Sequence, residues 1–146
     1  MAKVLYTAQA HVTGGRLHGH GRTSDGALDV QIRPPKELGG PGEGTNPEQL
    51  FAVGYAACFE SAVTTVARRM KLDTGDVAAE SKVSLVPNES RGFDLQVELD
   101  LTVPGLDGDD AMNLIRTAHQ VCPYSNAVRG NIPVAITVNG RPLAED

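Results

Sequence analysis

The chain is organised around residues 46–71, which read NPEQLFAVGYAACFESAVTTVARRMK. Asn46 can cap a helix, and Pro47 suits a first helical turn. Thr45 with Glu48 offers an alternative capping box. Since no proline or turn signal follows until the end of this stretch, we expect one long helix over it.

Apolar residues lie on two sides of this predicted helix. One stripe comprises Leu50, Val53, Gly54 and Ala57, and the other comprises Phe51, Tyr55, Cys58, Ala62 and Val66. A helix that is apolar on both sides is buried on both sides, so we expect a central buried helix. Its uncharged part, residues 49–59, is shorter than the roughly 20 residues that a membrane span needs. We therefore expect no membrane contact.

Strand patterns precede this helix. Residues 3–12 and 26–33 are β-prone runs, and the glycines at 14–15 and the Ser-Asp-Gly at 24–26 are turn signals between strands. The first third therefore predicts a small antiparallel sheet. Residues 34–47, rich in proline and glycine, predict a long surface loop.

After the helix, residues 76–103 alternate between apolar and polar side chains around a turn at 88–92, which predicts a two-stranded hairpin. Residues 111–121 predict a second helix, which Pro123 interrupts, and residues 133–138 predict a last strand. The order βββαββαβ lacks regular βαβ alternation. It favours an α+β fold with antiparallel sheets and the long central helix.

Length and composition narrow the classes of function. The 146 residues suit a single domain spanning 1–146, and the net charge of −5 disfavours binding to nucleic acid. The first ten residues lack a continuous apolar core, so they do not predict a secretion signal, and we expect a cytoplasmic protein. Six aromatic residues make a light core, which is consistent with burial through self-association.

The two cysteines raise the central question. Cys58 falls in mid-helix, where an inert buried thiol with a high pKa is the simplest interpretation. Cys122 lies 64 residues further on, beside Pro123. This spacing excludes a C-x-x-C redox pair and the paired C-x-x-C motifs of a zinc ribbon. If the thiols meet across two helices, a transient catalytic disulfide suits a reducing compartment better than a permanent one.

Short motifs are spread over nearly the whole sequence. They are TGGR (13–16), SDG (24–26), ELGG (37–40), GTNPEQLFA (44–52), GYAACF (54–59), CPYSNA (122–127) and RGN (129–131). Together they resemble the organic hydroperoxide resistance proteins, a family in one superfamily with osmotically inducible protein C. The C-P-Y-S-N run is typical of the hydroperoxide branch.

The resemblance implies a homodimeric thiol peroxidase with an intertwined α+β fold and active sites at the subunit interface. It identifies Cys58 as the peroxidatic cysteine and Cys122 as the resolving cysteine, with Arg16 and Glu48 as the activating pair. It implies an antioxidant enzyme that reduces organic hydroperoxides without a cofactor. It also implies an external dithiol reductant, a lipoylated protein or dihydrolipoamide rather than thioredoxin.

These roles are chemically consistent. A thiolate attacks peroxide oxygen, and a guanidinium from Arg16, held by Glu48, would stabilise both that thiolate and the developing alkoxide. Glu48 and Cys58 are ten residues apart, about 15 Å along a helix axis. One arginine hardly bridges that span, so we expect the partner chain to supply at least one of the three residues.

The substrate pocket and the alternative functions remain open on sequence. Phe51 and Tyr55 share the stripe of Cys58 and either line a pocket for organic hydroperoxides or belong to the core. His18 and His20 on one strand face, or His119 with Cys122, would supply too few ligands for a metal site, so we predict none. The alternatives are a small-ligand or metal-binding stress protein and a cysteine-dependent hydrolase in which a histidine activates Cys58.

Overall fold

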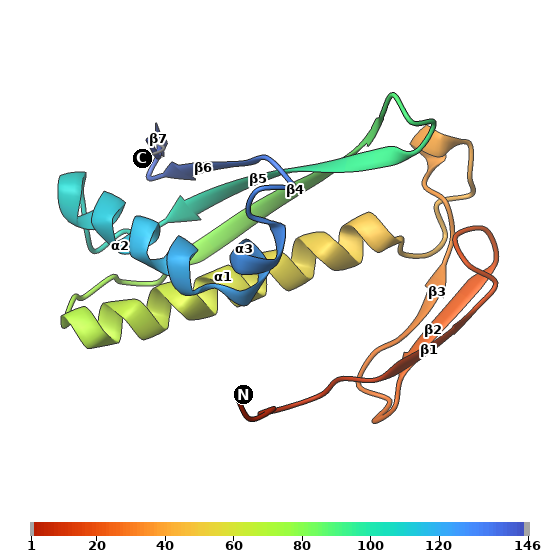
Figure 1. The fold of residues 1–146 in the computed structure, drawn as a ribbon, viewed down its shortest axis with the longest axis horizontal. Coiled ribbons are helices and arrows are strands. Elements are labelled where there is room, and N and C mark those ends of the chain that lie inside the picture. The colour runs from red at the N-terminus through yellow and green to blue at the C-terminus, as the bar shows by residue number, and fades with distance from the viewer. Residues whose placement is uncertain (1, 145–146) are drawn as a thin grey trace. The chain divides into compact units, whose positions relative to one another are not determined.

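The computed structural model describes residues 2–144, and the chain divides into two compact units, one ending at Leu50 and the other beginning at Phe51. The single domain expected from chain length stays a prediction. The elements, shown in Figure 1, are β1 (Ala10–Thr13), β2 (Gly19–Thr23), β3 (Asp29–Ile32), the 3₁₀ turn η1 (Lys36–Leu38), α1 (Pro47–Met70), β4 (Ala78–Pro87), β5 (Phe93–Thr102), α2 (Gly108–Val121), α3 (Pro123–Val128), β6 (Val134–Val138) and β7 (Arg141–Pro142). The predicted α+β class is confirmed.

The first unit contains a three-stranded antiparallel sheet in the order β1-β2-β3, as predicted. The predicted run at residues 3–12 is wrong in its first part, because only Ala10–Thr13 forms a strand. Ala10 pairs with Thr23, the last residue of β2. The residues before Ala10 therefore extend beyond the end of the neighbouring strand.

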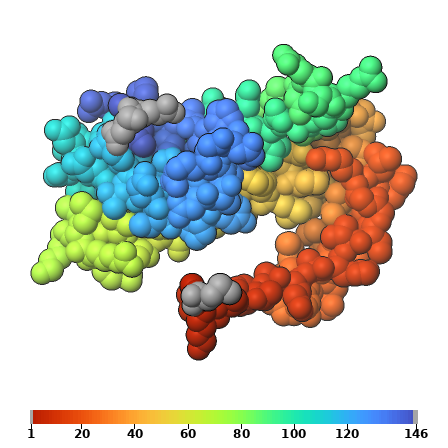
Figure 2. Space-filling view, in the orientation of Figure 1, coloured from red at the N-terminus to blue at the C-terminus, as the bar shows by residue number. Residues whose placement is uncertain are grey.

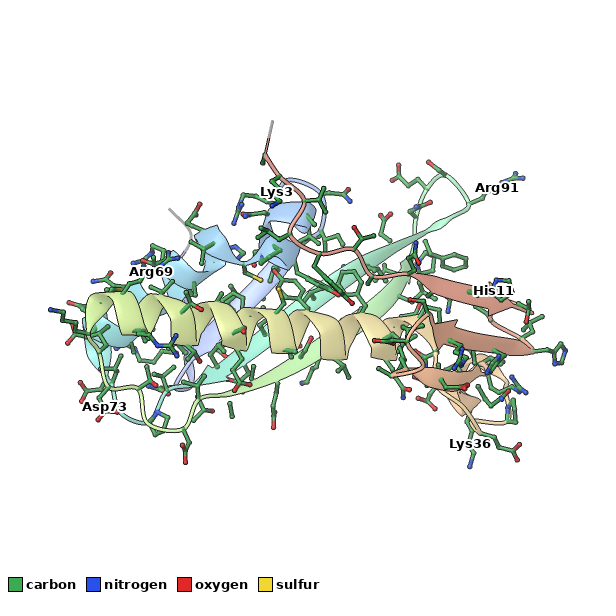
Figure 3. All side chains as sticks on the ribbon, turned by 90° about the horizontal axis from the view of Figure 1, so that it is seen from below. Lys3, His11, Lys36, Arg69, Asp73 and Arg91 are labelled. Atoms are coloured by element: carbon green, nitrogen blue, oxygen red, sulfur yellow. The ribbon has the colours of Figure 1, made fainter. Side chains whose placement is uncertain are left out.

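Helix α1 begins and ends where its sequence predicts. The Asn46 side chain accepts a hydrogen bond of 2.8 Å from the backbone N–H of Gln49, so Asn46 is the cap. The helix ends at Met70 because Lys71 adopts a left-handed φ of 59°. Figure 3 labels Arg69 at this carboxyl end, where an exposed cation suits the negative end of the helix dipole.

The second unit contains a four-stranded sheet in the order β4-β5-β6-β7. The predicted hairpin is confirmed, with β4 antiparallel to β5 and the Asn88 side chain holding the turn by accepting hydrogen bonds from two backbone N–H groups. The purely antiparallel prediction is wrong for one pair, since β6 runs parallel to β5. The chain between them passes through α2 and α3, and such a crossover allows parallel pairing.

Helices α2 and α3 meet at Cys122. Helix α2 starts at Gly108, earlier than the predicted residue 111, and α3 follows it directly with Pro123 in its first turn. Pro123 thus lies where one helix ends and another begins, whereas the sequence predicts only an interruption there. In the space-filling view, α2 and α3 (cyan to blue) form a continuous surface on this unit (Figure 2).

One face of α1 lies in the core of the second unit, together with α2 and the inner face of the sheet. Its buried side chains are Tyr55, Phe59, Ala62, Val63, Val66 and Ala67. The expectation that both faces are buried is wrong within this chain, because Val53 is 71% exposed and Ala57 is also exposed. Although α1 has the length and apolar composition of a membrane span, its buried side chains make it a core helix.

Candidate functional site

Arg16 and Glu48 form a two-pronged ion pair in the first unit. Arg16 follows the Gly14-Gly15 turn, and Glu48 lies in the first turn of α1. The Arg16 guanidinium donates two hydrogen bonds, of 2.9 and 2.6 Å, to the two carboxylate oxygens of Glu48. These bonds lower the pKa of Glu48 and raise that of Arg16, which keeps the pair ionised.

Cys58 and Cys122 come together in the second unit. Cys58 lies in the middle of α1 and is half-buried, while Cys122 lies between α2 and α3 and is fully buried. Cys58 packs against the apolar core that contains Cys122, and Cys122 lies close enough to raise the pKa of the Cys58 thiol. Both are free thiols. The expectation that residues 64 apart in sequence meet across packed helices is consistent with this contact.

The protonation of Cys58 is set by opposing influences. Burial raises its pKa above the ordinary 9.0, and Cys122 raises it further, whereas a hydrogen bond from the backbone N–H of Tyr124 lowers it. The mid-helix position of Cys58 predicts only a high pKa and gives no indication of this amide at the beginning of α3. A proline directly after Cys122 is the signal that could have located it, because proline favours a first helical turn.

Aromatic rings surround this part of α1. Phe51, Tyr55 and Tyr124 form a cluster with ring centroids 5.6 to 6.2 Å apart. Tyr55 is fully buried, while Phe51 is half-buried. Tyr124 packs over Gly54, where an added Cβ would lie 2.5 Å from the Tyr124 hydroxyl oxygen. A small residue at position 54 therefore lets the Tyr124 ring approach the helix.

A buried hydrogen-bonded chain joins three elements beside the cysteines. The Ser125 hydroxyl of α3 lies 2.7 Å from the Tyr55 hydroxyl and 2.8 Å from Nδ1 of His119 on α2. Burial and the nearby Arg129 guanidinium lower the pKa of His119, which favours a neutral ring. The sequence reading missed this chain, since nothing in local spacing pairs positions 55 and 125.

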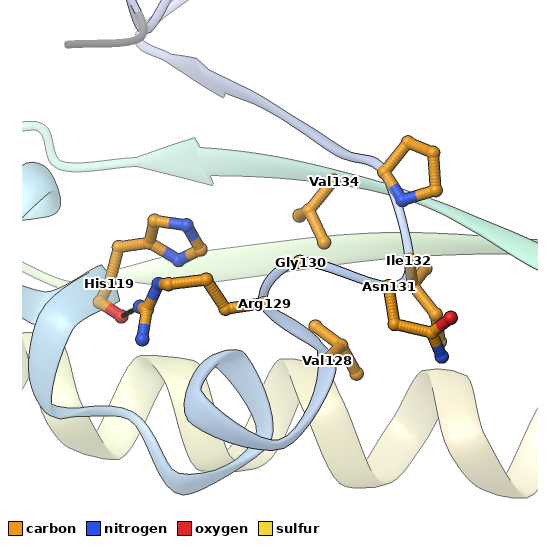
Figure 4. Close-up of a pocket in the computed structure, with 8 residues that line it drawn as sticks. His119, Val128, Arg129, Gly130, Asn131, Ile132 and Val134 are labelled. Atoms are coloured by element: carbon orange, nitrogen blue, oxygen red, sulfur yellow. Dashed lines mark hydrogen bonds between the residues drawn. The ribbon is translucent and has the colours of Figure 1, made fainter.

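His119 also borders a cavity of about 380 Å³ at the connection from α3 to β6. Figure 4 shows that Arg129 lies beside His119 there, and its guanidinium donates a 2.6 Å hydrogen bond to the His119 backbone oxygen. The remaining lining is mainly apolar, including Val128, Ile132 and Val134.

The other histidine candidates do not form the arrangement that the sequence suggested. His18 precedes β2, which begins at Gly19, so His18 and His20 do not share a strand face. His20 instead contacts the carboxylate of Asp29 at 2.5 Å. Within residues 2–144, no group of three or more metal-ligating side chains comes together.

The predicted catalytic residues thus fall into two pairs, Arg16 with Glu48 and Cys58 with Cys122, one in each compact unit. The first pair supplies a fixed cation, and the second supplies two thiols able to form a disulfide. A fixed guanidinium stabilises anions, and paired thiols exchange electrons in two-electron steps.

Comparison with known sequences identifies relatives of nearly the same length. The model of the OsmC-like protein family matches residues 40–137. An organic hydroperoxide resistance protein of Xanthomonas axonopodis pv. citri is 53% identical over 140 residues, covering 93% of this chain and 96% of the relative. One from Bacillus subtilis is 44% identical over 133 residues, covering 90% of this chain and 96% of the relative.

Solved structures of proteins with the same name are similar to this chain in sequence and in fold. An organic hydroperoxide resistance protein from Legionella pneumophila is 51% identical, with a TM-score of 0.90 and coverage of 93% of this chain and 98% of that chain. One from Vibrio cholerae, with captopril bound in one of its active sites, is 46% identical, with a TM-score of 0.92 and coverage of 97% and 96%.

Proposed function

The chain belongs to the OsmC-like family and, within it, to the organic hydroperoxide resistance proteins, and on this premise we propose that it reduces organic hydroperoxides to alcohols through its two cysteines. The names of the relatives support a role in peroxide detoxification. The observation that carries the cysteine mechanism is the contact between Cys58 and Cys122 in the core.

The proposed cycle balances in three steps. The Cys58 thiolate attacks the terminal peroxide oxygen of ROOH, and the O–O bond breaks to give Cys58 sulfenic acid and RO⁻, which takes up a proton to become the alcohol. The Cys122 thiol then condenses with the sulfenic acid, forming the disulfide and releasing water. An external dithiol reduces the disulfide, restores both thiols and is itself oxidised to a disulfide.

Solvent access supports these separate roles. Cys58 is partly exposed, so a substrate can reach its sulfur, whereas Cys122 is fully buried and reacts only with a neighbour. Because burial and Cys122 raise the pKa of Cys58, the thiol needs a positive charge to ionise near neutral pH. We assign that role to Arg16, oriented by its ion pair with Glu48.

We further propose a homodimer whose partner chain supplies Arg16 and Glu48 to each cysteine pair. Along α1, Glu48 precedes Cys58 by ten residues, about 15 Å of helix. The exposed side of α1 carries Val53, 71% exposed, and large apolar side chains near the amino terminus are exposed as well, among them Leu5 at 95%. Apolar surface of this kind favours burial against a second copy.

The substrate class follows from the residues around Cys58. Phe51 lies about two helical turns before Cys58 on the same stripe and is half-buried, so we propose that it lines the path of an organic hydroperoxide. Tyr55 is fully buried, and its hydroxyl is bonded to Ser125, so we expect it to shape the floor of such a pocket. A cytoplasmic location and a lipoyl-type dithiol remain part of the proposal.

The contacts favour a peroxidase over a hydrolase. A hydrolase would need a histidine against Cys58, but His119 is bonded to Ser125, and the contacts of Cys58 include Tyr124 and Cys122. The metal-binding alternative gains no support from a ligand cluster in the described residues.

Turnover tests the proposed function. We expect purified protein with a dithiol to consume cumene hydroperoxide catalytically, and to lose this activity as Cys58→Ser. Ser84→Ala, on an exposed position of β4, is the control. Equal consumption by wild type and Cys58→Ser would contradict the mechanism.

Mixed dimers test the shared site. Chains carrying Arg16→Ala and chains carrying Cys58→Ser are each expected to be inactive or severely impaired. In a dimer of one chain of each kind, made by co-expression with two affinity tags, one site has both an intact Cys58 and an intact partner Arg16. We expect activity to return in the mixed dimer. An inactive mixed dimer would place Arg16 and Cys58 of each site in one chain.

A further inference from the structure

Ser125 is a buried polar residue in the core of the second unit, with an exposed fraction of 0%. Its hydroxyl bonds to the Tyr55 hydroxyl of α1 at 2.7 Å and to Nδ1 of His119 on α2 at 2.8 Å. A buried hydroxyl is costly unless it is hydrogen-bonded, and Ser125 has a partner on each side. It therefore joins three helices at one point.

Helix α3 depends on such contacts. It spans only Pro123–Val128, and helices this short are not stable without tertiary support. Ser125 anchors its first turn. After its last residue, Arg129 donates a 2.6 Å hydrogen bond to the backbone oxygen of His119 and another, of 2.5 Å, to Asn126. Figure 4 shows Arg129 beside His119 in this position.

Tyr124 directly precedes Ser125 and links the hydrogen bonds of Ser125 to Cys58. Tyr124 packs beside Cys58 against the same core, and its backbone N–H lowers the pKa of the Cys58 thiol. Its ring packs over Gly54, where an added Cβ would lie 3.1 Å from the ring carbon Cζ. The amide therefore reaches Cys58 only while the first turn of α3 stays seated on α1.

We propose that Ser125 is a positioning residue that holds the first turn of α3, and with it the Tyr124 amide, against the Cys58 sulfur. Ser125 acts on the Cys58 sulfur through Tyr124 rather than by direct contact. The inference rests on the proposed function in one respect, because the ionisation of Cys58 matters for catalysis only if its thiolate is the nucleophile.

Removing the Ser125 hydroxyl has two consequences. Tyr55 and His119 lose their shared partner, and the first turn of α3 is no longer fixed between α1 and α2. The Tyr124 amide then moves away from the sulfur, and the Cys58 anion loses a hydrogen-bond donor. Hydrogen bonds to charged groups are strong enough to move an ionisation midpoint by about one pH unit, a tenfold change in the thiolate fraction below that midpoint.

The test measures the ionisation of Cys58 directly. Reduced protein is alkylated with iodoacetamide across a range of pH, and the labelled Cys58 peptide is quantified by mass spectrometry after digestion. We expect Ser125→Ala to raise the midpoint of Cys58 alkylation by about one pH unit. Ser125→Thr, which keeps the hydroxyl, should restore a midpoint near that of wild type. Ser84→Ala is the matched control and should leave the midpoint unchanged.

A second variant, at Gly54, displaces the Tyr124 amide without changing Ser125. Gly54→Ala pushes the Tyr124 ring away from α1 while leaving the Ser125 hydroxyl in place, and it should also raise the midpoint. If Ser125→Ala does not fold, Gly54→Ala carries the test. A folded Ser125→Ala protein with lowered thermal stability and an unshifted midpoint would make Ser125 merely structural and overturn the inference, as would an unshifted midpoint in folded Gly54→Ala.

The alkylation assay contains no peroxide, so it separates the two claims. Wild-type protein that fails to consume hydroperoxide would overturn the proposed function, while a raised midpoint in Ser125→Ala would still support the positioning role. Conversely, normal turnover with an unshifted midpoint would overturn the positioning role alone.

Discussion

The two candidate catalytic pairs differ in almost every physical respect. Arg16 and Glu48 are charged, and the Arg16 side chain is 45% exposed. Cys58 and Cys122 are free cysteines, and Cys122 is fully buried in an apolar core. The first pair is ionised but carries no thiol, whereas the second pair consists of two thiols, and burial raises the pKa of Cys58. Each pair supplies what the other lacks.

Under the proposed mechanism, this contrast makes neither pair sufficient by its own chemistry. A buried thiol with a raised pKa is a weak nucleophile at neutral pH, and a guanidinium bound to a carboxylate does not react with peroxide. Variants that alter only the cysteine pair or only the Arg16–Glu48 pair test this difference.

The largest effect on hydroperoxide reduction should come from substitutions of the two cysteines. Cys58→Ser should abolish hydroperoxide reduction, because a serine hydroxyl does not attack peroxide oxygen. Cys122→Ser should permit a single turnover, after which Cys58 accumulates as sulfenic and then sulfinic acid. Rapid-mixing kinetics followed by mass spectrometry of the Cys58 peptide measure both outcomes. Sustained dithiol-dependent turnover by Cys122→Ser would contradict its role as the resolving cysteine.

The next largest effect should come from removing the charge of Arg16. Arg16→Ala should lower the rate of the peroxide step by about 10²- to 10³-fold, the usual consequence of removing a group that stabilises developing negative charge. The measurement is the second-order rate constant for oxidation of Cys58. Arg22→Ala serves as the control, because Arg22 is an exposed arginine of β2 in the same compact unit as Arg16. A similar loss in both variants would point to a general electrostatic effect.

A smaller effect should reveal whether a second chain joins the two pairs. Val53 is 71% exposed on α1, so Val53→Asp costs little in an isolated chain. In the proposed dimer it would bury a charge against apolar surface and promote dissociation. Analytical ultracentrifugation over a concentration series should show a weakened dimer and lower specific activity. An unchanged dimer would exclude this face of α1 from the interface.

Much of the fold is predictable because its signals are local. The Asn46 cap, the alternation in the β4–β5 hairpin and the break at Pro123 each act within a few residues, and the structure has an element boundary or turn at each. The parallel pairing of β6 with β5 was not predictable from local pattern, because strand direction depends on how the crossover packs.

The pairing of the candidate residues was more predictable than their surroundings. The family resemblance implies that Arg16 pairs with Glu48 and Cys58 with Cys122, and the Arg16–Glu48 ion pair and the effect of Cys122 on the pKa of Cys58 agree with that pairing, while the catalytic roles stay predictions. The Tyr124 amide and the Tyr55–Ser125–His119 chain escaped prediction, since both arise from helices brought together by tertiary packing. Burial of Ser125 likewise has no local signature.

The smallest predicted effect concerns how the stability contributed by the Arg16–Glu48 ion pair depends on pH. Hydrogen bonds from Arg16 lower the pKa of Glu48 below its ordinary 4.5, so the ion pair stabilises the fold fully above that value. This contribution is lost as the pH falls through the lower folded-state pKa. The difference in unfolding free energy between wild type and Glu48→Gln should therefore stay constant near neutral pH and shrink as the pH falls below about 4.5. Urea unfolding at several pH values measures it, and a constant difference would mean that the ion pair contributes nothing.

The most direct test of the cysteine cycle uses one equivalent of an organic hydroperoxide and fully reduced protein. Free thiols are counted before and after the reaction, and the disulfide is mapped by non-reducing peptide analysis. The account predicts that both thiols disappear together and that Cys58 and Cys122 become joined within one chain. Retention of both thiols after the hydroperoxide has been added would contradict it.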